Sequence, residues 1–284
     1  MAQNTAFSPK KTLNLRGKLM LLDTQKIMGI INVTPDSFYE GSRAKSEKVV
    51  LKKAEQMLTE GATFIDLGGY SSRPGAEDIT VEEELNRVIP HIETIRFRLP
   101  ELYISVDTFR QDVAQKALEA GADMINDISG GDLDPGMYDL LQKYKVPYIA
   151  MHMQGNPQNM SSKANYADVT LEVYQNLKNK TSKLQSMGIK DIILDPGFGF
   201  AKTAEHSFEL LKNLGFLKTI GHPVLVGISR KSMIYKSLEI SPLEALNGTS
   251  ILNTIALQNG ADILRVHDVK EAAESVKLFN LTFR

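Results

Sequence analysis

Residues 103–127 read YISVDTFRQDVAQKALEAGADMIND, and this stretch decides the fold. Its two ends, YISVD and DMIND, are short apolar runs that finish in polar residues, as expected of buried strands. Between them, QDVAQKALEAG repeats apolar residues at helical spacing and predicts an inward stripe of Val113, Ala117 and Ala120. The stretch therefore predicts one strand–helix–strand unit with parallel strands.

The same pattern recurs along the whole chain. Eight apolar runs each stop at polar residues, and helical-looking stretches separate them. The runs are MGIIN (ending at Asn32), TFIDL (Asp66), YISVD (Asp107), DMIND (Asn126 and Asp127), PYIAMH (His152), DIILD (Asp195), PVLVGISR (Ser229 and Arg230) and ADILRVH (Arg265 and His267). Eight strand–helix repeats predict an α/β fold, a single (β/α)8 TIM barrel, and such barrels carry their chemistry at the carboxyl ends of the strands.

Length and composition agree with one such barrel. The 284 residues suit a single domain, 1–284, with a lead-in over about residues 1–25 that includes a hairpin through Leu19–Asp23 beneath the barrel floor. A formal net charge of −1 gives no reason to expect nucleic acid or a membrane surface as a partner. The chain has no Cys, which excludes disulfides and thiol catalysis, and it has no apolar run of the ~18 residues that cross a bilayer. We therefore expect a cytoplasmic protein.

Several side chains on the predicted elements have local interpretations. Pro90 should kink or restart the second helix, because proline lacks the N–H that a helix interior needs. His91 and His206 lie on predicted helices and are expected at the surface, while His152 is at least as easily structural as catalytic. A helix is expected from Pro242, which stands at a favourable first position.

The polar residues at the strand ends are of complementary kinds. Acceptors and an amide form one set (Asp66, Asp107, Asn126 and Asp195), and cations form another (Lys231, Arg265 and His267). The first set suits a flat heterocycle with several N–H donors, because a buried acceptor without a partner is costly. The second set stands where barrels commonly bind phosphate. Any single Asp can instead cap the next helix, and the glycines of DPGFGF (195–200) alone are weak evidence for a phosphate loop. Together the residues predict a site for a ring that bears a phosphate or diphosphate.

These strand ends also carry a family resemblance. GIINVTPDSF (29–38) resembles the opening signature of dihydropteroate synthases, and further blocks follow in that family's order. They are GGYSSRPGA (68–76), SVDT (105–108), INDISGG (125–131), MHMQGNP (151–157), DPGFGF (195–200), GISRKS (227–232) and RVHDV (265–269). The resemblance runs from about residue 28 to the C-terminus, which is nearly the whole chain.

The resemblance implies an enzyme that joins 6-hydroxymethyl-7,8-dihydropterin diphosphate to p-aminobenzoate. It assigns the pterin to Asp107, Asn126, Met151, Asp195 and Lys231, the diphosphate to Asn32, Arg265 and His267, and p-aminobenzoate to Phe38, Ser72, Arg73, Pro74, Phe200 and Ser232. Its catalytic residues would be Asp36, Asp107, Asp195 and Lys231, with Asn32 as the ligand of a Mg²⁺ cofactor. The reaction would begin with loss of diphosphate, and the aniline nitrogen would then attack the pterin cation. The family also implies small-molecule substrates and a homodimer packed through the late helices.

Two loops depart from the common pattern of that family. Tyr70 and Ser72 stand where the family more often has Glu and Thr, and residues 39–42 read YEGS where it more often has a Ser-Asp-Gly-Gly run. Since Ser72 keeps a hydroxyl, these departures concern loop geometry rather than activity.

Two alternatives share the barrel. A pterin-binding methyltransferase that serves a corrinoid protein would use the same acceptors, but gives little reason for the RVH, SRPG and SRKS segments together. A catalytically idle pterin-binding barrel would be expected to lose Asn32 or the cations, and all of these are present.

Overall fold

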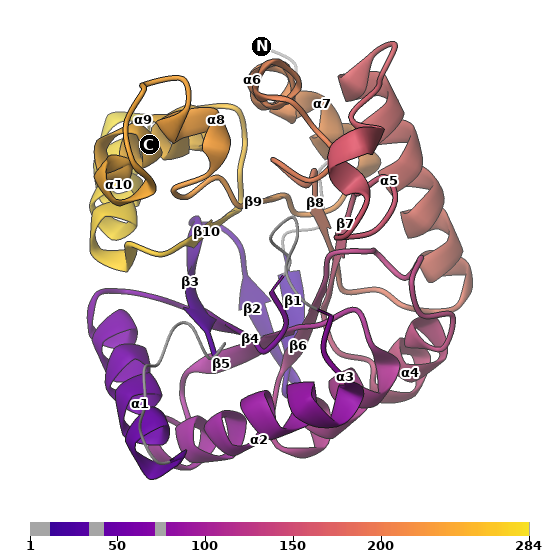
Figure 1. Cartoon of the computed structure of the whole chain (residues 1–284), viewed down its shortest axis with the longest axis vertical. Helices are drawn as coiled ribbons and strands as arrows, with labels where there is room; N and C mark the ends of the chain where they lie inside the picture. Colours follow the sequence, from indigo (N-terminus) through magenta and orange to yellow (C-terminus); the bar gives the residue numbers. More distant parts are fainter. Residues whose placement is uncertain (1–11, 34–42, 72–77, 284) are drawn as a thin grey trace.

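The eight predicted strands form one parallel sheet that curves into a barrel (Figure 1). The computed structural model describes residues 12–33, 43–71 and 78–283. Within them the strand order is β8-β7-β6-β5-β4-β3-β10-β9, and an isolated parallel bridge between Leu194 and Val224 joins the two edges. The strands are β3 (Lys26–Asn32), β4 (Phe64–Gly68), β5 (Tyr103–Asp107), β6 (Met124–Asp127), β7 (Tyr148–Met151), β8 (Ile192–Asp195), β9 (Leu225–Val226) and β10 (Ile263–Val266). The predicted barrel is therefore confirmed.

Helices surround the sheet and connect each strand to the next (Figure 1). The α-helices are α1 (Arg43–Thr59), α2 (Val81–Arg98), α3 (Gln111–Glu119), α4 (Met137–Tyr144), α5 (Val169–Ser186), α6 (Ala204–Lys212), α7 (Leu214–Leu217), α8 (Ser232–Tyr235), α9 (Leu246–Gln258) and α10 (Val269–Phe283). Among the described residues there are also the 3-10 turns η3 (Met160–Lys163), η4 (Lys218–Ile220) and η5 (Pro242–Glu244). The main core lies between this helical ring and the outward side chains of the strands, such as Ile65, Ile104 and Ile192.

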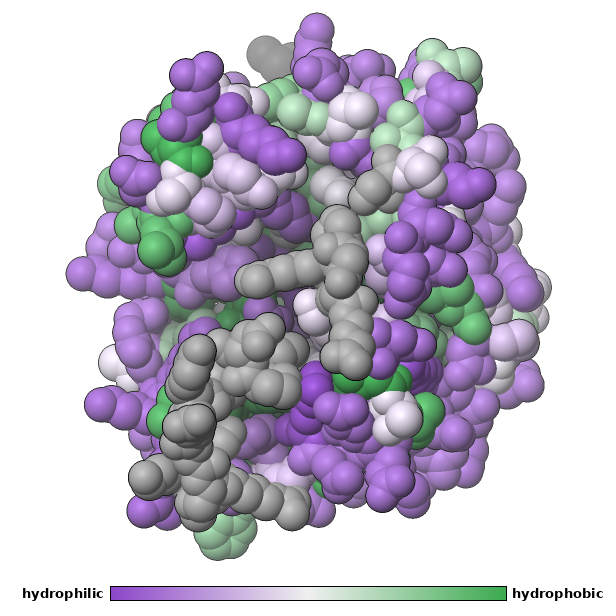
Figure 2. Space-filling model, in the orientation of Figure 1, coloured by the Kyte–Doolittle hydropathy of each residue, from purple (hydrophilic) through white to green (hydrophobic). Residues whose placement is uncertain are grey.

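The interior of the barrel is closed at one end by an N-terminal hairpin, which lies earlier in the chain than the hairpin expected through Leu19–Asp23. The hairpin consists of β1 (Thr12–Leu15) and β2 (Lys18–Leu21), paired antiparallel. Its Leu13 and Leu15 are fully buried in a second apolar cluster, with one inward residue from most barrel strands: Met28, Phe64, Met124, Ile149, Ile193, Leu225 and Ile263. The hairpin lies behind the barrel strands in Figure 1, so that view looks onto the carboxyl ends. Figure 2 shows this face as mostly hydrophilic, with apolar residues in small separate groups.

Some local predictions were wrong. Helix α2 runs unbroken through Pro90, since its N-cap Thr80 accepts from Glu83 N–H and its buried Val88 and Ile92 pack on the core from both sides of the proline. His91, expected at the surface, lies in the same buried stripe with 7% of its area exposed.

Other predictions differ from the structure in where an element begins or ends, or in how exposed a side chain is. On α3, Val113 and Ala117 are buried as predicted, but Ala120 lies beyond the helix and is only half-buried. The helix expected from Pro242 is split into η5 and α9, because the first turn is a separate 3-10 turn with its own capping box from Ser241 and Glu244. His206, expected at the surface, is half-buried and caps α6 with Thr203.

Candidate active site

Strand alternation brings the predicted site residues to the inside of the barrel. Successive side chains of a strand point to opposite faces, so residues two apart share a face. Two positions beyond the floor cluster, the inward residues turn polar: Asp66 follows Phe64, Asn126 follows Met124, Asp195 follows Ile193 and Arg265 follows Ile263. Asp107 joins them from β5, where its Cα pairs with those of Gly68 and Asn126. The apolar floor thus gives way to a polar layer at the carboxyl ends.

Arg265 is the centre of a buried ion-pair network in this layer. Its Nε donates to Asp66 Oδ2 and its Nη2 to Asp107 Oδ2, both at 2.6 Å. Asn126 Nδ2 donates to the same Asp66 oxygen at 2.8 Å. Asp66 is fully buried, and 18% of the Asp107 side chain is exposed. Asp66, which the sequence marks as an acceptor but the family assignment leaves out, therefore orients Arg265 and Asn126 together.

The protonation of this network depends on its burial. Burial raises the pKa of Asp107 to about 7, with Arg265 opposing the rise and Asp66 adding to it. Burial lowers the pKa of Arg265, but the carboxylates of Asp66 and Asp107 outweigh that effect and leave it above its ordinary value. Asp66 Oδ1 is buried without a hydrogen-bond partner among the described residues. Such an acceptor is costly unless a ligand N–H or a water completes it, so the geometry favours a donor-rich ligand here.

Asp195 and Lys231 form a second charged group of the site. Asp195 Oδ1 accepts from Gly197 N–H at 2.7 Å, and Lys231 Nζ donates to Phe198 O at 2.6 Å. The Lys231 ammonium also lies 4.8 Å from the centre of the Phe200 ring. Burial raises the pKa of Asp195 while Lys231 opposes it, and burial lowers the pKa of Lys231 to about 8 while Asp195 opposes it. Each group therefore favours the charged form of the other near neutral pH.

A second lysine, which the sequence interpretation missed, stabilises the loop that follows Asp195. Lys202 is buried and donates to the carbonyls of Gly197 and Phe200, both at 3.0 Å. Its Nζ lies 2.9 Å from Nδ1 of His152, whose pKa is lowered to about 2 by burial and by Lys202. His152 is thus a neutral structural residue. In the sequence, Lys202 directly follows DPGFGFA, whose last residues, Phe200 and Ala201, are apolar. A lysine is seldom buried among apolar residues unless it is paired, so this position was the one sequence signal for Lys202.

His267 and Ser229 stand side by side at the ends of the last two strands. Ser229 Oγ lies 3.0 Å from His267 Nδ1 and accepts from His267 N–H at 3.2 Å. When the Ser229 hydroxyl donates to Nδ1, the neutral imidazole carries its proton on Nε2; in the other tautomer Nδ1–H donates to the hydroxyl. Burial, with Arg265 and Lys53 nearby, lowers the pKa of His267 to about 4. The neighbouring Arg230 pairs with Asp268 through Nε and Nη2, both at 2.8 Å, and so joins the same two strand ends.

The remaining predicted residues fall into two groups. Asn32 ends β3 and is half-buried, Met151 ends β7 and is buried, and Ser232 begins α8 directly after Lys231. Asp36, Phe38, Ser72, Arg73 and Pro74 lie outside the described residues.

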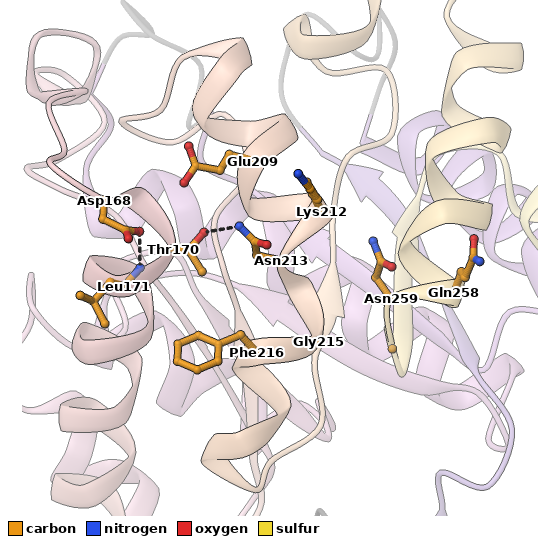
Figure 3. A pocket seen from close by; sticks show the side chains of 11 residues that line it. Asp168, Thr170, Leu171, Glu209, Lys212, Asn213, Gly215, Phe216, Gln258 and Asn259 are labelled. Carbon is orange, nitrogen blue, oxygen red and sulfur yellow. Dashed lines mark hydrogen bonds between the residues drawn. The ribbon is translucent and has the colours of Figure 1, made fainter.

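A cavity of about 770 Å³ lies elsewhere, on the outer wall of the barrel (Figure 3). It is bounded by the start of α5, the end of α6, α7 and the end of α9. Its hydrogen bonds serve the helices themselves: Asp168 caps α5 at Leu171 N–H, and Asn213 donates to Thr170 (Figure 3). Its lining includes the charged residues Asp168, Glu209 and Lys212, but none of the predicted site residues, so the barrel mouth remains the candidate active site.

Comparison with known proteins identifies the family. The pterin binding enzyme family matches residues 28–267. A dihydropteroate synthase of Escherichia coli is 42% identical over 269 residues, which cover 94% of this chain and 95% of that protein. The chain belongs to the dihydropteroate synthase family.

Solved dihydropteroate synthases have the same fold. The Yersinia pestis enzyme, solved in a sulfonamide drug complex, superimposes with a TM-score of 0.89 at 39% identity and covers 95% of this chain and 98% of that one. The Xanthomonas albilineans enzyme, solved with 4-aminobenzoic acid, also gives a TM-score of 0.89, at 36% identity, and covers 97% of this chain and 98% of that one. As a member of the family, the chain is a pterin-binding enzyme of folate synthesis.

Within the described residues, no helix is long and apolar enough to span a bilayer. The same residues hold no cluster of three or more His, Asp or Glu that would bind a metal ion by itself.

Proposed function

We propose that this enzyme condenses 6-hydroxymethyl-7,8-dihydropterin diphosphate with p-aminobenzoate, releasing 7,8-dihydropteroate and diphosphate. The observation that carries the proposal is the polar layer above an apolar floor, in which carboxylates and an amide lie next to Lys231, Arg265 and His267. A ring rich in N–H donors fits the first set, and an anionic leaving group fits the second.

The pterin ring would lie against Asp107, Asn126, Asp195 and Lys231, with Met151 contributing apolar contact. Asp195 has one oxygen engaged by Gly197 N–H, so the other is available for a ring donor. Lys231 suits a ring carbonyl because it is a cation at neutral pH. One of its three N–H donors is used by Phe198 O, and two remain for a ligand.

The diphosphate would be held by Asn32, Arg265 and His267. A guanidinium has five N–H donors. Asp66 and Asp107 take two of them on Arg265, so three remain for phosphate oxygens. A neutral His267 can donate from Nε2, and a bound diphosphate would raise its pKa toward the charged form.

Mg²⁺ fits this anion site as a companion of the diphosphate. Mg²⁺ usually keeps several waters and binds through few protein oxygens plus substrate phosphates, so the single amide oxygen of Asn32 is a sufficient protein ligand. When bound, Mg²⁺ would neutralise charge on the leaving diphosphate.

The reaction would proceed by breaking the bond between the pterin methylene carbon and the diphosphate oxygen, whose electron pair leaves with diphosphate. The carboxylates of Asp107 and Asp195 would stabilise the positive charge that develops over the pterin. The aniline nitrogen of p-aminobenzoate then forms the new C–N bond and loses a proton. Phe200 and Ser232 would line the p-aminobenzoate side with Phe38, Ser72, Arg73 and Pro74, and Asp36 is proposed as a further catalytic carboxylate.

A product assay tests the proposal directly. Purified enzyme with both substrates and Mg²⁺ should form dihydropteroate and diphosphate in equal amounts, and absence of both products would refute it. Arg265→Ala and Asn32→Ala should weaken binding of the pterin diphosphate much more than that of the bare pterin, because they act on the anion. Equal losses for both ligands would remove these residues from the diphosphate site.

We also propose that the enzyme is a homodimer packed through its late helices. The support is exposed apolar surface there: 51% of Ile251 and 37% of Ile255, one turn apart on α9, and 84% of Leu243 on η5. Exposed apolar side chains grouped on one face often mark an interface. Sedimentation should show a dimer that Ile251→Glu dissociates, while Leu19→Glu, at an exposed hairpin position, leaves it intact.

A further inference from the structure

Asp66 lies behind the residues that face the candidate site. Its side chain on β4 is fully buried, whereas 17% of the Arg265 side chain and 18% of the Asp107 side chain are exposed. The Oδ2 oxygen of Asp66 accepts both from Arg265 Nε at 2.6 Å and from Asn126 Nδ2 at 2.8 Å. Asp66 can therefore act on a ligand through the two side chains that donate to it.

The contact with Asp66 fixes the direction of the Asn126 amide. The oxygen and the NH2 group of a side-chain amide have nearly the same shape, so their hydrogen-bond partners decide which of them faces which way. An ionised carboxylate can only accept, and the end of Asn126 that faces Asp66 is therefore the NH2 group. The Oδ1 end of Asn126 is then the one that can accept a hydrogen bond from a ring N–H.

This direction gives the ring side of the site one hydrogen-bond character. Asn126 is the register partner of Asp107 on the neighbouring strand β5, and Asp107 and Asp195 are acceptors as well. A carboxamide in place of the Asp66 carboxylate could donate as well as accept, so the amide of Asn126 could turn over and present its NH2 group to the ligand. A ring donor would then meet a donor. The charge of Asp66 thus makes the amide an acceptor.

The same oxygen also fixes the guanidinium of Arg265. Nε donates to Asp66 Oδ2 and Nη2 donates to Asp107 Oδ2, so two carboxylates hold one planar group from two directions. Neither contact uses Nη1, and this NH2 group can donate to an anion. One carboxylate oxygen of Asp66 therefore connects the amide proposed for the ring with the cation proposed for the diphosphate.

We propose that Asp66 is a positioning residue that decides which groups of the site accept and which donate, so that Asn126 offers an acceptor to the ring and Arg265 offers donors to the diphosphate. The proposal rests on the function proposed above and deepens it, because it names the residue that makes the site select a donor-rich ring. Loss of the Asp66 charge should weaken binding of both parts of the pterin diphosphate. It should also reduce the preference for a ring that carries an amine over one that carries a carbonyl.

Calorimetry with three probes tests this. The probes are the pterin diphosphate, the bare 6-hydroxymethyl-7,8-dihydropterin, and the matching lumazine, in which a carbonyl replaces the exocyclic amine. Asp66→Asn should weaken binding of the bare pterin by about 5-fold or more, since a neutral hydrogen bond has roughly half the strength of a charge-assisted one. It should weaken the pterin diphosphate further and lower the preference for the pterin over the lumazine. In steady-state kinetics, the KM for p-aminobenzoate should stay within about twofold, because no contact of Asp66 given above involves a residue proposed for that substrate.

Asp123 provides a matched control at the other end of the barrel. Like Asp66 it is a buried carboxylate that pairs with an arginine: its Oδ1 lies 3.0 Å from Arg16 Nε, and its Oδ2 accepts from Ile104 N–H at 2.7 Å. It directly precedes β6, which begins at Met124, and so stands at the amino end of that strand. Asp123→Asn should change none of the three affinities and should keep the preference for the pterin.

Asp66→Glu covers the case in which Asp66→Asn does not fold. It keeps the charge but moves the carboxylate by one methylene, so it should weaken binding of the bare pterin and the pterin diphosphate while the preference for the pterin over the lumazine remains. The proposal is overturned by equal binding of both rings to the wild-type enzyme, by an unchanged preference in Asp66→Asn, by unchanged affinities or a lost preference in Asp66→Glu, or by the same losses in Asp123→Asn. Failure of the wild-type enzyme to form dihydropteroate would instead refute the proposed function.

Discussion

Replacing Arg265 with Met should destabilise the fold in a strongly pH-dependent way. The substitution leaves Asp66 and Asp107 close together without the guanidinium that bridges them at 2.6 Å on either side. Removing one partner of a buried ion pair costs ~3–5 kcal/mol, because the remaining charge is uncompensated. Asp66 is fully buried and 18% of the Asp107 side chain is exposed, which places the expected loss toward the lower end of that range but above the small range of exposed pairs.

The sign of the pH effect follows from the pKa of Asp107. Burial raises that pKa in the folded enzyme to about 7, above the ordinary 3.8, so folding is favoured by protonation and stability falls as the pH rises toward 7. Without Arg265, which opposes the rise, the folded pKa climbs further. Wild-type stability should then level off above about pH 7 while the variant continues to lose stability, so the gap between them widens from pH 6 to pH 9.

Urea unfolding followed by circular dichroism at several pH values measures this gap. The double variant Arg265→Met with Asp107→Asn is the internal control, because it removes the one of the two stranded carboxylates whose titration widens the gap, and it should remove most of that widening at pH 9. A deficit below about 1 kcal/mol, the range of exposed pairs, or one that does not change with pH would refute the buried-pair reasoning.

Three further outcomes are expected. Asp195→Ala should abolish pterin binding by calorimetry while the fold is kept, since charge-assisted hydrogen bonds are worth ~1.5–3 kcal/mol each; binding within a few-fold of wild type would place the ring elsewhere. Lys202→Met should lower the unfolding free energy by ~1–3 kcal/mol, because the carbonyls of Gly197 and Phe200 lose their donor, and an unchanged urea midpoint would contradict its bracing role. Leu13→Ala should cost ~2–5 kcal/mol of stability at the fully buried barrel floor. Leu19→Ala, 73% exposed on the same hairpin, should change stability by no more than ~0.5 kcal/mol, and similar losses in the two would mean that the hairpin does not seal the floor.

The barrel was predictable because each strand combined an apolar run with a polar end. That pattern needs only local sequence, and it also located the acceptors and cations that the structure collects at one level of the interior. The inward direction of Asp66, Asn126, Asp195 and Arg265 follows from the two-residue period, once the floor residues are known.

What the sequence could not provide were pairings between distant residues. Arg265 meets Asp66 and Asp107 across separations of 199 and 158 residues, and no local pattern encodes which carboxylate a strand-end cation will face. The burial of Lys202 was missed for a different reason: its partners are mainly backbone carbonyls, two of them within five residues, and the pattern of side chains does not mark a backbone partner. The prediction of a kink at Pro90 was wrong because it rested on the helix propensity of one residue. Tertiary packing on both sides of Pro90 keeps the helix continuous.

The barrel has a seam, meaning a junction between two neighbouring strands that lacks a regular hydrogen-bond ladder, and this seam lies at the candidate site. Seven neighbouring strand pairs share regular ladders, whereas within the described residues β8 and β9 are joined by the single bridge of Leu194 and Val224. Asp195 lies immediately on one side of this seam, and Lys231 reaches across from the other to the carbonyl of Phe198. A side-chain contact thus takes the place of a missing backbone ladder. Amide hydrogen exchange should be fastest along β9 among the barrel strands, and a ligand that engages Asp195 and Lys231 together should slow it by closing the sheet on itself.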